Sequence, residues 1–469
     1  MGNTGRAEPT WKKLIPYLFS AVILFPLTLG LIEEIYQRSV LTIGAAMLLG
    51  TGLTLAITLL RINRKPDLRR IRKIPLALMM MTGVGILIAF FDHKTGWSYL
   101  LMAIDMLAVF PLYYLVEAGR ENDQAIPRAM AIEMMVLSAL IYGLCLWQAA
   151  AGQSRFTADR YFGPLHNPNP MSTIGSYGVM CGLYIAHRSA KTMGRMIACG
   201  LSAGCGMALL LLGAGRTSAV ALAGCLLIEG VYLLRRRQLR QRIPEENKTE
   251  GEKDGRGRWA PSAAFLLAAL LTLLPAYAVR EGSGILLEPV RIMTPDGRSV
   301  EKMVPVGKYE GRATGTISRF IQKEESLDEF SNGRLDIWRM YFEHLTLRGG
   351  DPDVIEREVL KYHHDPNAHN NYLTVAYACG IPTGVLYFLW VLSMGIVGIR
   401  LVFGKQFARP EYPFAAMLIF SFAVQSMLDV ALFPFWSLAP CMLFLCGGPA
   451  MEKDQRTGAV QPVMRSRMS

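Results

Sequence analysis

The segment "RINRKPDLRRIRK", residues 61–73, decides the fold because it places seven basic residues between two long apolar runs. The runs on either side, 40–60 and 74–91, contain no charged residue. Each is close to the ~20 residues that a helix needs to cross a bilayer. The pattern predicts two membrane-spanning helices whose connecting loop lies on the cytoplasmic side, where Lys and Arg are retained.

The composition of the whole chain agrees with this membrane pattern. Its 469 residues are 52% hydrophobic and only 18% charged, with a mean hydropathy of +0.27, whereas soluble chains average about 25% charged residues. In a soluble protein, the formal net charge of +12 would suggest a nucleic-acid partner. The basic residues instead gather beside apolar runs, so we expect contact with membrane lipids and no nucleic acid.

The alternation of apolar runs and basic loops continues along the chain. The runs are 14–32, 40–60, 74–91, 98–117, 129–149, 171–187, 194–213, 217–234, 260–279, 380–403, 412–429 and 432–448. A basic loop follows every even-numbered run that has a successor, and the short loops after odd-numbered runs carry at most two Lys or Arg residues each. We therefore expect an all-α polytopic membrane protein of about twelve transmembrane helices, with both termini cytoplasmic.

This topology divides the chain into four parts. Residues 1–279 are predicted to hold transmembrane helices 1–9, with short loops and a basic cytoplasmic loop at 235–258. Residues 280–370 form one large extracytoplasmic loop subdomain, which contains more acidic than basic residues. Residues 371–448 hold helices 10–12, and 449–469 form a cytoplasmic tail.

The large loop is expected to contain its own secondary structure. Residues 285–306 alternate about a Pro-Asp-Gly turn, which suggests a β-hairpin. The stretch 331–350, "SNGRLDIWRMYFEHLTLRGG", predicts an amphipathic helix that starts at Ser331 or Asn332 and stops at Gly349. Its apolar face is expected to lie on the membrane or on the helical bundle. A short second helix is expected in "VIEREVLKY", residues 354–362.

Cysteine and histidine spacing gives no metal signature. The eight cysteines lie in or beside apolar runs and show no CxxC pattern, so they are interpreted as small buried hydrophobic residues. His363, His364, Asp365 and His369 are close in sequence but match no strong zinc or two-metal spacing. The sequence therefore predicts no metal, no disulfide and no cofactor.

Four polar clusters fall on the predicted extracytoplasmic side. They are "RYFGPLHNPNP" (160–170), "GAGRTS" (213–218), "SNGRLDIW" (331–338) and "DPNAHNNYL" (365–373). The polar residues on the cytoplasmic side are loose basic loops by comparison. An extracytoplasmic active site would require such a one-sided gathering of Arg, His and Asn.

Each cluster also has a structural explanation that the sequence leaves open. Asn169 and the proline after it can start a helix, and a helix start can also bind an anionic phosphate. Arg216 can reach to the membrane interface or face a ligand among its small neighbours. Arg334 lies where the helix dipole disfavours a cation, so it should pair with an acid or an anionic ligand. His369 can cap the next helix or act as a general base near neutral pH.

The four motifs, in this order, resemble the O-antigen ligase and polymerase family, which are membrane glycosyltransferases that use undecaprenyl-diphosphate-linked glycans. "AHNNYLTVAYACGIPTGVLYFLW" (368–390) is similar to the family's H-N-x-Y-L element and the helix after it. "GPLHNPNP", "GAGRTSAVAL" and "SNGRLDIW" resemble three further elements. The resemblance covers nearly the whole chain, except for the hairpin-like insert at 285–306 and the long basic loop at 235–258.

The resemblance implies roles for individual residues. His369 would be the catalytic base, and Arg216 and Arg334 would contact the donor diphosphate. Candidates for contacts to the substrate or to the residues around it are Arg160, Asn167, Asn169, Asn370 and Tyr372, with Arg160 added on charge and position alone. The implied reaction is an inverting, metal-independent glycosyl transfer of the EC 2.4 class, with the polyprenyl tail between the spans.

The partners implied are an undecaprenyl-diphosphate-linked glycan donor and a glycan, lipid or protein acceptor, in the inner (plasma) membrane of a bacterium. The shared motifs do not separate a ligase from a polymerase. An alternative from another class is a transporter of polysaccharide or lipid-linked oligosaccharide. Transporters place charged or helix-breaking residues near the bilayer midplane, and Pro382 and Asp429 keep that alternative open.

Overall fold

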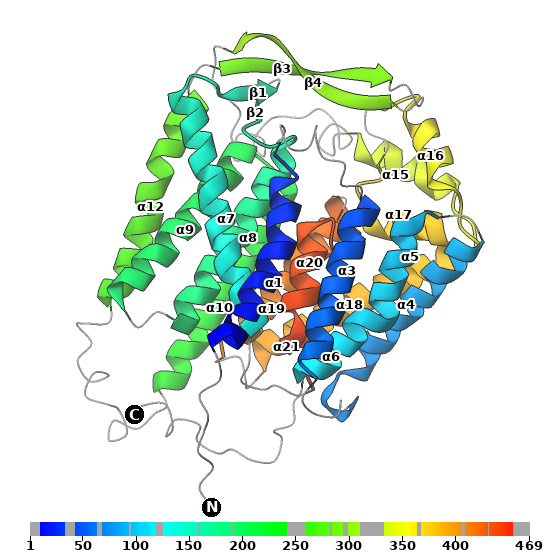
Figure 1. Ribbon diagram of the computed structural model, residues 1–469, viewed down its shortest axis with the longest axis horizontal. Coiled ribbons are helices and arrows are strands. Elements are labelled where there is room, and N and C mark those ends of the chain that lie inside the picture. Colours follow the sequence, from blue (N-terminus) through cyan, green and yellow to red (C-terminus); the bar gives the residue numbers. More distant parts are fainter. Residues whose placement is uncertain are drawn as a thin grey trace, which may run out of the picture.

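The computed structural model of the protein shows a helical bundle with a small β-sheet across one end (Figure 1). We call this end of the bundle the sheet end. The structure describes residues 10–32, 43–62, 68–92, 95–118, 125–157, 160–189, 192–241, 259–281, 284–293, 299–309, 333–363, 367–404, 409–429 and 431–453.

Most of the described residues are helical, as the apolar runs predicted. The helices of the first half are α1 (Thr10–Leu29), α3 (Ile43–Leu60), α4 (Lys73–Phe91), α5 (Trp97–Ile104), α6 (Phe110–Ala118), α7 (Ala125–Ala150), α8 (Pro168–Ser189), α9 (Met193–Gly213), α10 (Arg216–Gln241) and α12 (Trp259–Glu281). Those of the second half are α15 (Arg334–Glu343), α16 (Pro352–Val359), α17 (Asn371–Cys379), α18 (Ile381–Phe403), α19 (Glu411–Leu428), α20 (Leu438–Cys446) and α21 (Gly448–Met451). A 3₁₀ turn, η1 (Leu68–Arg70), precedes α4, and a π-helical turn, η2 (Asp105–Val109), joins α5 to α6.

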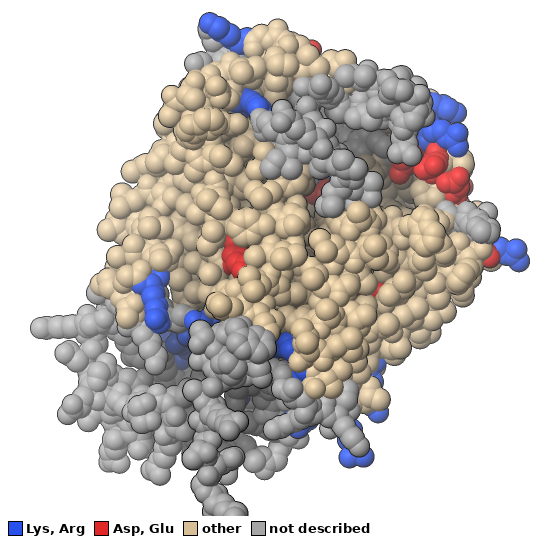
Figure 2. Space-filling view, in the orientation of Figure 1, with Lys and Arg blue, Asp and Glu red and all other residues tan. Residues whose placement is uncertain are grey.

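The protein is a multi-pass membrane protein by the length and composition of these helices. Within the described ranges, 8 helical stretches are long and apolar enough to cross a bilayer. α1 and α3 add shorter apolar stretches, Leu14–Leu29 and Gly44–Leu60. The predicted twelfth run holds only the nine-residue α20, so the count of twelve stays a prediction. In Figure 2 a broad flank with few basic side chains separates Lys and Arg at the two ends of the molecule.

Small residues let α9 pack tightly on both of its neighbours. A Cβ atom at Gly200 would lie 2.4 Å from the carbonyl oxygen of Phe265 on α12. On the other side, a Cβ at Gly206 would lie 2.5 Å from the carbonyl oxygen of Gly175 on α8. Helices in lipid associate through such close backbone approach rather than through hydrophobic burial. This packing fixes the start of α8 beside the turn between α9 and α10.

The sheet corrects the all-α expectation. Its strands are β1 (Arg155–Thr157), β2 (Arg160–Tyr161), β3 (Gly284–Met293) and β4 (Ser299–Tyr309), in the order β2-β1-β3-β4. The antiparallel pair β3–β4 matches the hairpin predicted at 285–306. β1 runs parallel to β3 and antiparallel to β2, and neither short strand was predicted. Strands of two or three residues are too short to show an alternating pattern.

The amphipathic helix of the large loop is shorter than predicted. α15 begins after Gly333 and ends at Glu343, six residues before the predicted stop at Gly349. The chain leaves the helix because the Thr346 carbonyl accepts a hydrogen bond from the Ile381 N–H, at 3.0 Å, which holds it against the start of α18. The predicted starts Ser331 and Asn332 lie outside the described residues.

The apolar face of α15 packs against α16 and against α17 of the helical bundle, and the bundle was one of the two placements predicted for it. Ile337 and Tyr341 are buried in a small cluster with apolar residues of α16 and α17, and the ring of Tyr341 lies edge-on to that of Tyr377. α16 overlaps the stretch 354–362 predicted as a second helix but begins two residues earlier and ends three residues earlier, and its first turn is capped by the side chain of Asp351. The cluster positions the start of α15, where Arg334 is the first residue.

We expect Gly200→Ala to destabilise the protein by about 1–3 kcal/mol, because the added methyl group would press against the α12 backbone. Gly194→Ala on the same helix is the matched control, since a Cβ there meets nothing within 4 Å. Thermal unfolding of both variants in detergent micelles measures the difference. Equal melting temperatures would contradict the tight α9–α12 contact.

Candidate functional site

The end of α19 is the point at which the predicted site residues meet. The carbonyl oxygen of Leu428, the last residue of α19, accepts a hydrogen bond from the Thr217 hydroxyl at 3.3 Å and another from the Arg334 guanidinium. The next residue, Asp429, has its Oδ1 atom 3.6 Å from Nδ1 of His369. Arg216 is the first residue of α10, directly before Thr217. The starts of α10 and α15 and the residue His369 therefore surround one helix end.

His369 has an unusual backbone conformation. Its φ angle is +48°, and Ala214 in the turn between α9 and α10 has the same value. Within the described ranges these are the two non-glycine residues with positive φ. The left-handed region costs an L-residue roughly 1–2 kcal/mol, and such strain gathers at functional sites. Both residues belong to polar motifs that the sequence singled out.

Two neighbouring asparagines divide structural tasks at the start of α17. Asn370 caps the helix, because its Oδ1 accepts the N–H of Leu373 at 3.1 Å. Asn371 is 1% exposed, donates to the Ser426 hydroxyl at 3.1 Å and accepts the N–H of Ala431 at 3.1 Å. Asn371 thus ties α17 to α19 and to the segment that follows α19. Sequence analysis did not select it, although an asparagine just inside an apolar helix is a usable signal.

Tyr372 packs into the helical bundle. Its ring lies edge-on to the rings of Tyr387 and Phe388 on α18, with centroids 5.7 and 5.6 Å away. The described contacts give Tyr372 a packing role, and they do not bring its ring to the end of α19. Its predicted contact with substrate stays a prediction.

The start of α8 lies two residues earlier than predicted. The helix begins at Pro168, and Asn167 accepts the N–H of Asn169 at 2.8 Å. Asn167 is therefore the capping residue that Asn169 was expected to be, because proline fits the first helical position. The side chain of Asn169 is left to accept a hydrogen bond from the Arg160 guanidinium at 3.0 Å.

Arg160 connects the sheet to the helix ends. It belongs to β2, and its guanidinium also donates to the carbonyl oxygen of Gly213, the last residue of α9, at 2.6 Å. Its neighbour Tyr161 is fully buried, and burial raises the pKa of that phenol well above its ordinary value. The neutral Tyr161 ring packs against Phe156 of β1 and anchors β2.

Hydrogen bonds join the starts of α8 and α10. The Gly215 N–H donates to the Ser172 hydroxyl at 2.9 Å. The hydroxyl groups of Thr173 and Ser218 lie 3.1 Å apart. The Arg160–Asn169 pair and the start of α10, which carries Arg216, therefore belong to one connected group of residues.

The electrostatic result is a region rich in positive charge. The starts of α8, α10, α15 and α17 are joined by the contacts above, and each helix start carries a partial positive charge of roughly half a unit. Arg160, Arg216 and Arg334 add three full charges at or beside those helix starts. Asp429, Asp336 in the first turn of α15 and the ends of α9 and α19 contribute negative charge, and the three arginines and four helix starts outweigh it. Such a region attracts an anion, because helix starts also present free N–H groups.

In the described part of the chain, no group of three or more His, Cys, Asp or Glu side chains is arranged to hold a metal ion. His364 and Asp365 lie outside the described residues.

Comparison with known proteins finds no family model and no curated protein that matches the chain.

The strain at His369 makes a testable contribution to stability. His369→Gly is expected to be more stable than His369→Ala by about 1 kcal/mol, because glycine adopts positive φ without steric cost. Both variants lose the imidazole, so the difference between their free energies of unfolding reports the cost of the backbone conformation. Thermal unfolding in micelles measures it, and a glycine variant that is less stable than the alanine variant would contradict the strained conformation.

Proposed function

We propose that the protein is a membrane glycosyltransferase. It transfers a glycan from an undecaprenyl-diphosphate-linked donor to an acceptor hydroxyl on the extracytoplasmic face. The observation that carries the proposal is the convergence of Arg334, His369 and the start of α10, with Arg216, at the end of α19. These are the residues for which the motif resemblance implies catalytic and diphosphate-binding roles.

The cationic residues suit a diphosphate leaving group. Breaking the bond between sugar and phosphate places negative charge on the lipid diphosphate. The guanidinium groups of Arg216 and Arg334 can pair with phosphate oxygens in a bidentate manner, and helix starts that are already in place stabilise the charge as it develops. This electrostatic stabilisation needs no reorganisation at the moment of reaction.

His369 suits the role of general base. The acceptor hydroxyl must lose a proton as its oxygen attacks the anomeric carbon, and an imidazole can take that proton near neutral pH. The Asp429 carboxylate, 3.6 Å from Nδ1, would attract the positive charge that the ring acquires. Nδ1 then faces Asp429, which leaves Nε2 as the atom that receives the proton.

The proposed reaction requires a defined topology. We propose about twelve spans with both termini cytoplasmic, in the plasma membrane of a bacterium, and with the sheet end on the extracytoplasmic side. The 8 long apolar stretches and the basic loops after even-numbered runs support this arrangement. The candidate site then lies at the level of the lipid headgroups.

We expect His369→Ala to reduce glycan transfer by roughly 10²–10⁴-fold, which is the usual contribution of a general base. His344→Ala is the matched control, since His344 is exposed and its ring nitrogen contacts only the Met340 carbonyl among the contacts described for that ring. Transfer is measured by complementation of a deletion strain, with membrane levels checked by immunoblot. Full transfer by His369→Ala at normal membrane level would refute the general-base role.

The same deletion strain separates the two reactions of the family. Accumulation of single lipid-linked repeat units indicates a polymerase, which joins one lipid-linked glycan to another. Accumulation of full-length lipid-linked polymer indicates a ligase, which hands the glycan to a different acceptor. Either result is compatible with the same donor site.

A transporter is the second candidate, and one buried acid favours it. Asp105 is fully buried in the π-helical turn inside the apolar stretch Trp97–Ala118. Its Oδ1 atom accepts the Thr51 hydroxyl at 2.8 Å, and Oδ2 has no hydrogen-bond partner among the described atoms. Acidic residues at such depth mark ion or proton pathways in transporters.

Asp105→Asn tests this alternative. The amide oxygen can still accept from Thr51, so a glycosyltransferase should keep glycan transfer within about twofold and should unfold at nearly the same temperature. Asp105→Ala removes the acceptor of the Thr51 hydroxyl and leaves this buried donor without a partner, so the variant should lose about 1–3 kcal/mol of stability. If Asp105→Asn abolished glycan export at normal membrane level, the transporter would be the better assignment.

A further inference from the structure

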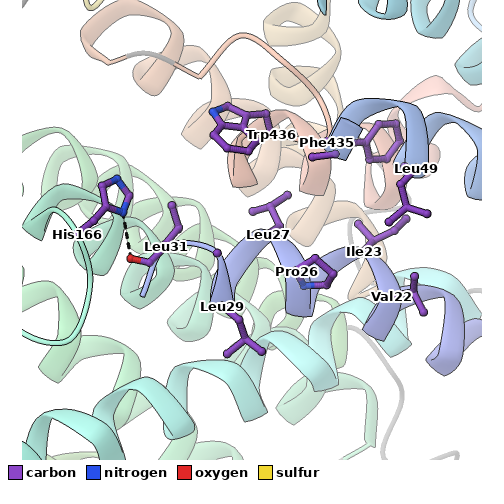
Figure 3. Close-up of a pocket in the computed structure, with 13 residues that line it drawn as sticks. Val22, Ile23, Pro26, Leu27, Leu29, Leu31, Leu49, His166, Phe435 and Trp436 are labelled. Carbon is purple, nitrogen blue, oxygen red and sulfur yellow. Dashed lines mark hydrogen bonds between the residues drawn. The ribbon is translucent and has the colours of Figure 1, made fainter. Parts of the chain in front are cut away.

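An apolar cavity of about 420 Å³ lies between α1, α3 and the segment after α19 (Figure 3). Its volume falls within the range of roughly 300–1,000 Å³ that is usual for ligand pockets. Most of its lining comes from Val22–Leu31 of α1 and the residues after it, with Leu49 of α3 opposite and Phe435 and Trp436 beside it. His166 is the single side chain in the lining that can be charged.

The cavity opens toward the lipid-facing flank of the bundle. Val22 and Leu49 line it and are each 43% exposed. Leu18 on α1 and Leu48 on α3 are even more exposed, at 65% and 62%. Large apolar side chains that face outward on these two helices mark a surface covered by hydrocarbon. A hydrocarbon chain can therefore enter between α1 and α3 without crossing water.

One wall of the cavity is formed by His166, and the residues that follow it in the chain belong to the candidate site. The imidazole Nδ1 and the N–H of His166 contact the Leu31 carbonyl oxygen at 3.0 and 2.8 Å, which closes the cavity at the sheet end. The next residue, Asn167, caps α8, where Asn169 contacts Arg160. The polar rim of the cavity is thus part of the loop that forms one side of the cationic region.

A second wall of the cavity is formed by the chain segment that comes directly after Asp429 of the candidate site. Phe435 and Trp436 lie a few residues after Asp429. The segment that joins Asp429 to Phe435 is held by the hydrogen bond from the Ala431 N–H to the Asn371 side chain. Phe435 packs directly against Gly50, where a Cβ atom would come within 2.1 Å of its ring. Because Gly50 has no side chain, the ring can form the inner wall of the cavity.

We propose that this cavity binds the hydrocarbon chain of the lipid whose diphosphate occupies the cationic site. The inference rests on the proposed function, and it adds the place of the chain and the direction from which the lipid enters. One amphiphilic molecule fits the arrangement, since its polar group needs the arginines and helix starts, and its chain needs an apolar space that borders the same loop, at His166 and Asn167. A phospholipid of the bilayer could supply a chain, but its headgroup has a single phosphate and needs no second guanidinium.

Filling the mouth of the cavity tests the proposal. Leu49→Trp should raise the KM for a donor with a long prenyl chain by roughly tenfold, the loss expected when burial of about two methylene groups is removed. It should leave the kcat unchanged, and also the KM for a donor that carries only one or two isoprene units. Leu48→Trp, one residue away on the lipid-facing surface, is the matched control. An equal KM for both variants with the long-chain donor would overturn the proposal.

A binding measurement separates this inference from the proposed reaction. Protein in nanodiscs is labelled with a prenyl diphosphate that carries a diazirine in its chain, with phosphatidylglycerol as competitor. Labelling of α1 and α3 that Leu49→Trp removes and phosphatidylglycerol does not compete supports the cavity, even if the wild-type protein transfers no glycan. Labelling at other helices, or full competition by phosphatidylglycerol, would overturn it.

Discussion

The carbonyl group at the end of α19 is the interaction on which the candidate site depends. The last carbonyls of a helix have no partner within the helix, and leaving one unsatisfied in apolar surroundings is costly. Here the Leu428 oxygen is satisfied by Thr217 from one direction and by Arg334 from another. The bonds that complete α19 are thus the same bonds that bring two distant polar motifs together.

Sequence patterns predicted the parts of the fold that repeat. The apolar runs, the β3–β4 hairpin and the existence of α15 and α16 all follow from periodicity or from length. β1 and β2 could not be predicted, because strands this short exist only through pairing: β1 pairs with β3, and β2 pairs with β1. The early end of α15 depends on a bond between Thr346 and Ile381, which are distant in sequence. Errors of this kind arise wherever a tertiary contact outweighs a local preference.

The sequence identified the residue types of the site better than their partners. Arg334 was expected to face an acid or a ligand; its guanidinium donates to the carbonyl oxygen of Leu428, and the expected contact stays a prediction. Asn370 was a candidate for substrate contact and is a helix cap, whereas Asn371 makes the buried contacts to α19. Neighbouring residues on a helix point about 100° apart, so only the structure shows which of the two asparagines faces the core.

Asp429 gives the strongest physical reason to distinguish a catalytic site from a simple anion-binding site. A carboxylate beside arginines and helix starts repels a diphosphate, so anion binding alone would favour a neutral residue there. In the proposed reaction the carboxylate has a separate use, because it lies 3.6 Å from the imidazole of His369 and would stabilise the proton that this ring receives. A base that must collect a proton next to a departing anion would account for this carboxylate.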